Sequence, residues 1–95
     1  MSDSTLHELS KSVVMLKRER SSLVKTVEQE LQGFLRYGRR WRVRDSVKFE
    51  EKSRLIEALM GQFESLTERI NTGETRFRAE VRRVMGLFRS VKGGR

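Results

Sequence analysis

Apolar residues recur every seven positions along almost the whole chain. In the second half this row reads Phe49, Ile56, Phe63, Ile70, Phe77, Val84 and Val91, and a companion row three residues later begins with Leu59 and Leu66. In the first half the two rows begin at Leu6 and at Leu9. Two apolar positions in every seven make a narrow stripe on a helix, which is typical of a coiled-coil seam. The polar or small exceptions in these rows are Arg20, Glu30, Gly73 and Glu80.

The two halves do not join in phase. The first row, extended beyond Trp41, predicts an apolar residue at position 48, whereas the second row begins at Phe49. Gly38 stands where a glycine often ends a helix, and Asp45 or Ser46 can cap a new one. The pattern therefore predicts a single all-α domain over 1–95, an antiparallel two-helix coiled-coil hairpin. Its expected parts are a first helix over about 5–37, a basic turn at 38–45 and a second helix over about 46–91.

Two features of this hairpin stay open. The stretch Ile70–Thr75, INTGET, contains Asn71 and Gly73, which would end a helix and give a three-helix bundle instead. The seven-residue spacing continues across it, from Ile70 to Phe77, and favours one long helix. Two pairing registers also fit equally well: one places Leu16 against Phe63, and the other places Leu16 against Ile70.

The side chains that catalysis and metal binding usually need are scarce. The chain has no cysteine, and its one histidine, His7, lies near the N-terminus without a pocket to present it. No Glu-x-x-His pair is present for a di-iron bundle site. We therefore expect no enzyme activity, no catalytic residue, no metal and no cofactor. The sequence has neither an apolar run of about 20 residues nor a Sec-type signal, which predicts a cytoplasmic protein and is compatible with signal-less secretion.

The formal net charge of +8 is concentrated in two blocks. Residues 36–44 hold five arginines and no acid, and residues 75–95 hold seven bases and one acid. Arginine suits bidentate contacts to phosphate, so nucleic acid is a candidate partner. The predicted contacts are Arg36, Arg39, Arg40, Trp41, Arg42, Arg44, Arg78, Arg82, Arg83 and Arg89. Alternatively, Tyr37 and Trp41 fill the end of the hairpin while the arginines face water.

The C-terminal segment 81–95 forms a basic amphipathic tail. In either register the first helix is long enough to cover the second only to about residue 80. The apolar side chains that follow residue 80 therefore have no partner within the hairpin. The predicted interface comprises Val81, Val84, Leu87, Phe88 and Val91. We expect the partner to be a second copy of the chain or another helical protein, with a membrane surface less favoured. The leading hypothesis is a non-enzymatic assembly or adaptor protein.

One layout is similar to a known family. Trp41 at the turn, followed by Phe49–Glu50–Glu51 at the start of the next helix, resembles the small type VII-secreted Trp-X-Gly hairpin proteins. The chain has Val43 where that motif has its glycine. The resemblance implies a secretion-system hairpin protein, and flagellar and type III export chaperones share the helical-hairpin style.

Overall fold

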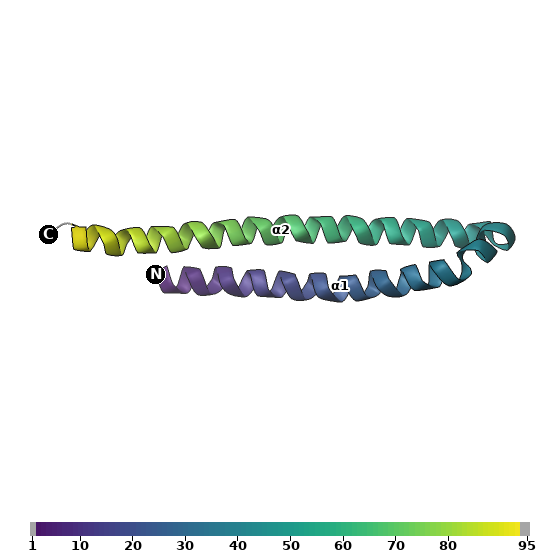
Figure 1. Ribbon diagram of the computed structural model, residues 1–95, viewed down its shortest axis with the longest axis horizontal. Helices are drawn as coiled ribbons and strands as arrows, with labels where there is room; N and C mark the ends of the chain where they lie inside the picture. The colour runs from purple at the N-terminus through teal and green to yellow at the C-terminus, as the bar shows by residue number, and fades with distance from the viewer. Residues whose placement is uncertain (1, 94–95) are drawn as a thin grey trace.

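The chain folds into two long antiparallel helices that lie side by side. The computed structural model describes residues 2–93, with side chains over 5–89. Helix α1 covers Ser2–Arg44 and helix α2 covers Ser46–Gly93 (Figure 1). The hairpin measures 79 × 17 × 14 Å, and the described part of the chain has no strand. The predicted all-α two-helix hairpin is confirmed.

Helix α2 passes through Asn71–Gly73 without a break, so the three-helix alternative is wrong. Gly73 faces α1 so closely that a β-carbon placed on it would lie 2.8 Å from Cγ2 of Val13. The Thr75 hydroxyl donates a hydrogen bond of 2.9 Å to the Asn71 carbonyl oxygen, within the helix. The glycine that suggested a helix end is therefore a point of close approach between the two helices.

The predicted turn at 38–45 is wrong, because α1 remains helical through Arg44 and only Asp45 separates the helices. The Asp45 amide donates to the Trp41 carbonyl (2.8 Å), and the Phe49 amide donates to the Asp45 carbonyl (3.1 Å). The Asp45 carboxylate accepts a 3.1 Å bond from the Lys48 amide, as an N-cap residue does. The predicted cap at Asp45 is thus confirmed.

The turn prediction failed because Gly38 does not end a helix. No described residue has a positive φ angle, so Gly38 is an ordinary helical residue, and it is buried. Arginine is a good helix former, and the segment that follows Gly38 extends α1 to Arg44. At the other end, α1 begins at Ser2 instead of at residue 5.

The core is a thin line of side chains between the helices. The buried apolar residues are Val13, Leu16, Leu59, Leu66 and Ile70. Leu16 packs with Leu66 and Ile70 in one cluster, against which Leu23 also packs. These contacts, and the close approach of Gly73 to Val13, show that the helices pair in the second of the two predicted registers, in which Leu16 meets Ile70.

The charged exceptions in the seven-residue rows have specific partners. Arg20 lies over the Phe63 ring, 5.9 Å from its centroid, and its guanidinium is 3.4 Å from the Thr67 hydroxyl. Glu30 accepts two bonds from the Lys52 ammonium, of 3.1 and 3.2 Å, across the seam. Polar residues in a seam restrict which pairings are favourable, so these contacts help to fix the register.

Candidate functional site

We call the bend that joins the two helices, around Asp45, the elbow. Aromatic rings gather there, between the end of α1 and the start of α2. The Phe34 ring lies 5.2 Å from that of Phe49 on α2 and 6.1 Å from that of Trp41, edge to face. Gly38 makes room for this arrangement, since a β-carbon there would lie 3.2 Å from Cδ1 of Phe34. Tyr37 also contacts Trp41, at 6.0 Å between centroids. Aromatic packing therefore holds the end of α1 against the start of α2.

Trp41 takes part in this packing and is half-buried. The Lys48 ammonium lies over its ring, 5.2 Å from the centroid. The Trp41 ring thus already has partners within the hairpin, while Tyr37 remains 43% exposed. A ligand contact by Trp41 stays a prediction.

The outer surface of α1 at the elbow carries a dense positive charge. We call this surface the basic tip, and it consists of Arg36, Arg39, Arg40, Arg42 and Arg44. All five side chains are exposed. Within the described part of the chain, none of them forms an ion pair or a hydrogen bond to another side chain. Two exposed apolar residues lie among them, Leu35 and Val43, at 86% and 83% exposure.

The opposite end of the hairpin exposes apolar side chains. Helix α2 continues past the start of α1 (Figure 1). Extending the register from Leu16 and Ile70 places Ser2 opposite Val84, so α2 runs about 13 Å farther. Coverage by α1 therefore ends near residue 84, slightly later than the expected 80.

We call the apolar residues there the apolar end, and they comprise Val81, Val84, Leu87 and Phe88. Val84 is half-buried, whereas Leu87 and Phe88 are 52% and 66% exposed. Val81 is 36% exposed. The fifth predicted interface residue, Val91, lies outside the residues whose side chains are described. Within the described part of the chain, α1 does not cover Leu87 and Phe88.

The predicted basic residues of the tail do not form one cluster with the basic tip. Arg78, Arg82, Arg83 and Arg89 are exposed on α2, toward the end opposite the elbow. Arg83 donates hydrogen bonds to the Glu80 carboxylate, including one of 3.1 Å from Nε. This bond lowers the pKa of Glu80 and raises the pKa of Arg83. The two basic blocks of the sequence therefore lie toward opposite ends of the hairpin.

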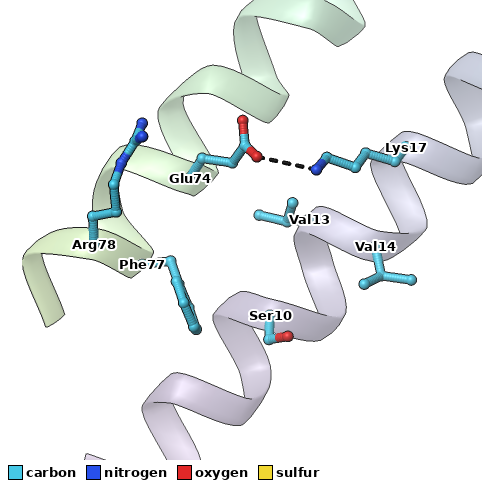
Figure 2. A pocket seen from close by; sticks show the side chains of 7 residues that line it. All are labelled: Ser10, Val13, Val14, Lys17, Glu74, Phe77 and Arg78. Carbon is cyan, nitrogen blue, oxygen red and sulfur yellow. Dashed lines mark ion pairs between the residues drawn. The ribbon is translucent and has the colours of Figure 1, made fainter. Parts of the chain in front are cut away.

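A shallow groove on one side of the seam was not predicted. Its apolar part comes from Val13, Val14 and Phe77, and a 3.0 Å ion pair between Lys17 and Glu74 crosses from α1 to α2 beside it (Figure 2). Lys17 and Glu74 lie outside the two apolar rows, so the seven-residue spacing gave no signal for their pairing. A scan of sequence positions flanking the seam for opposite charges would have found them once the register was known.

Among the described residues, no group of three or more His, Cys, Asp or Glu side chains is placed to hold a metal ion. In the same part of the chain, neither helix is long and apolar enough to cross a membrane. His7 is exposed on the first turns of α1.

Comparison with known proteins identifies no relative. No family model matches the chain, and neither the curated proteins nor the solved structures contain a significant match.

Proposed function

We propose that this protein is a non-enzymatic assembly module that acts by associating with copies of itself through helix–helix contacts. The observation that carries the proposal is the apolar end. There α2 continues past the start of α1 (Figure 1), and the apolar side chains of Leu87 and Phe88 are exposed. Val81, Val84 and Phe88 lie on one side of α2, at the spacing of three, four and seven residues that a partner helix would cover.

The total exposed surface supports association. The hairpin exposes 7963 Å², whereas a compact monomer of 11.2 kDa would expose about 5,700 Å². The excess is roughly 2,300 Å², and a standard protein interface buries about 800 Å² on each partner. One chain therefore presents more than enough surplus surface for a stable contact with a second.

The thin core points the same way. Among the residues whose side chains are described, only five apolar ones are buried, and Ile70 alone is almost completely so, at 1% exposure. A chain of this size gains limited stability from its own core, and oligomerisation is a common remedy. Association at the apolar end would add buried apolar surface at about 25 cal/mol per Å².

Sedimentation equilibrium of the full chain tests the proposal. We expect an oligomer at micromolar concentration, and a lower association state in the double variant Leu87→Ser and Phe88→Ser. The matched control is Leu35→Ser with Val43→Ser, which removes two apolar side chains at the other end that are even more exposed, at 86% and 83%. A well-folded monomer for the unmodified chain would refute the proposal. Equal effects of the two double variants would show that the apolar end is not the interface.

A further inference from the structure

The basic tip is a helical surface. Because the break between the helices is Asp45 alone, all five arginines lie on α1. At 100° per residue they spread over about 200° of the helix circumference. The rings of Phe34 and Trp41 occupy the remaining side, where they pack toward α2. The elbow thus holds five exposed arginines on α1, and Arg36, Arg39 and Arg42 border a hollow that extends to Phe49 of α2.

Nothing within the described chain neutralises this surface. Arg36, Arg40 and Arg44 follow one another at intervals of four residues, a spacing at which like charges on a helix repel. Asp45 is the nearest acid in sequence, and its carboxylate already caps α2 through the Lys48 amide. Arg42 and Arg44 are favoured by the negative end of the α1 dipole, but Arg36 and Arg39 lie too far from it. An external polyanion would relieve the repulsion.

We propose that the basic tip binds the phosphate backbone of nucleic acid. All the bases in the tip are arginines, whose planar guanidinium groups bind phosphate oxygens in pairs. The row Arg36, Arg40 and Arg44 rises about 6 Å per step, so several arginines can reach successive phosphates. This site lies at the opposite end of the hairpin from the apolar end, and a single chain carries all five arginines.

The geometry argues against a membrane surface as the ligand. A helix that lies on a bilayer needs a continuous apolar face opposite its charged face. At the elbow that face is already occupied, because Phe34 packs against Phe49 of α2. The exposed Leu35 and Val43 are separated from each other by arginines and form no stripe.

The composition of the tip also predicts the kind of recognition. Residues 36–48 contain neither asparagine nor glutamine, which are the usual side chains for reading adenine. Contacts to phosphate carry no direct sequence information. Arginine in the major groove is the usual side chain for reading guanine, so any sequence preference of the tip should be for guanine and not for adenine.

The experiment measures binding of the full chain to a fluorescent 20-base-pair duplex, by anisotropy, between 50 and 200 mM KCl. The tip variant changes all five arginines to glutamine, which is nearly as good a helix former. The control variant changes five exposed bases elsewhere to glutamine: Lys11, Arg18, Lys25, Arg54 and Arg69. Both variants lose the same formal charge of five.

We expect the tip variant to bind at least tenfold more weakly at 50 mM salt, and the control to change by less than threefold. The slope of log affinity against log salt should fall by about 0.9 for each phosphate contact removed. A second variant, with only Arg36, Arg39 and Arg40 changed to glutamine, keeps the two arginines next to the helix terminus. It should lose binding to an intermediate extent, and circular dichroism would verify that it remains helical.

Three results would overturn the proposal. Equal losses in the tip and control variants would show that net charge alone drives binding, and an unchanged tip variant would exclude the tip. Binding of poly-glutamate, or of vesicles containing 30% anionic lipid, would overturn it if that binding depended on the tip and exceeded binding of the duplex.

Discussion

The contact between Gly73 and Val13 gives the sharpest test of the helix pairing, through the substitution Gly73→Ala. In an exposed helix the change from glycine to alanine stabilises by about 1 kcal/mol. At Gly73 the new β-carbon would lie 2.8 Å from Cγ2 of Val13, whereas carbon atoms normally approach to about 3.5–4.0 Å. The helices must then separate locally by nearly 1 Å, because the β-branched Val13 side chain has little rotamer freedom.

Forced overpacking of this kind typically destabilises by about 1–3 kcal/mol. The gain in helix propensity of about 1 kcal/mol offsets part of this cost. Gly73→Ala should therefore lower the free energy of unfolding by roughly 0–2 kcal/mol. Gly61→Ala is the matched control in the same helix, since a β-carbon on Gly61 would have no neighbour within 4 Å. It should stabilise by about 1 kcal/mol. The propensity gain is common to both, so their difference of about 1–3 kcal/mol reports the steric effect.

Urea unfolding followed by circular dichroism at 222 nm measures these values, at one fixed protein concentration because association would shift them. A double-mutant cycle adds a rescue: once Val13→Ala has removed the Cγ2 atom, Gly73→Ala should become stabilising, as it is at Gly61. If Gly73→Ala stabilised the unmodified chain as much as Gly61→Ala, the close approach at this point of the seam would be refuted.

Three further predictions concern polar contacts. Glu30→Lys should destabilise by about 1–2 kcal/mol, because it places like charges across a partly buried pair, and adding Lys52→Glu should restore most of the loss in urea unfolding. Asp45→Ala removes the helix cap and should lower the free energy of unfolding by about 1 kcal/mol, and a near-zero change would contradict the cap. The lowered pKa of Glu80 means that its bond to Arg83 stabilises above the unfolded-state pKa and is lost as pH falls through the folded pKa. In NMR titrations, Arg83→Gln should raise the Glu80 midpoint, and an unchanged midpoint would contradict the assigned cause.

The seven-residue spacing was sufficient to predict the two-helix hairpin and the long second helix. It worked because a narrow apolar stripe can be buried only against a similar stripe. The spacing from Ile70 to Phe77 was a better guide than the Asn71 and Gly73 residues between them. A glycine costs only about 1 kcal/mol in a helix, which the packing on either side of Gly73 can offset.

The sequence predicted which residues form the two candidate surfaces, but it did not predict how the structure arranges them. The arginines of the basic tip were expected in a turn, where they would have had no fixed relative positions, and they lie on a helix instead. The exposed Leu87 and Phe88 agree with the reasoning that α1 is too short to cover the tail. The groove beside Val14 and the pairing of Lys17 with Glu74 depend on the register, which the spacing alone left open.

The position of the elbow in the sequence determines the register in which the two helices pair. In an antiparallel hairpin, moving the elbow by half a seven-residue repeat along the chain shifts every pairing by a whole repeat. An elbow centred between Arg39 and Arg40 would have placed Leu16 against Phe63, whereas an elbow centred on Val43 places Leu16 with Ile70, as found. The choice was made by the segment after Gly38, because its arginines continue α1 and Asp45 is the first good cap. The residues that form the basic tip therefore also determine how far α2 extends past α1, and so which apolar side chains remain exposed at the other end.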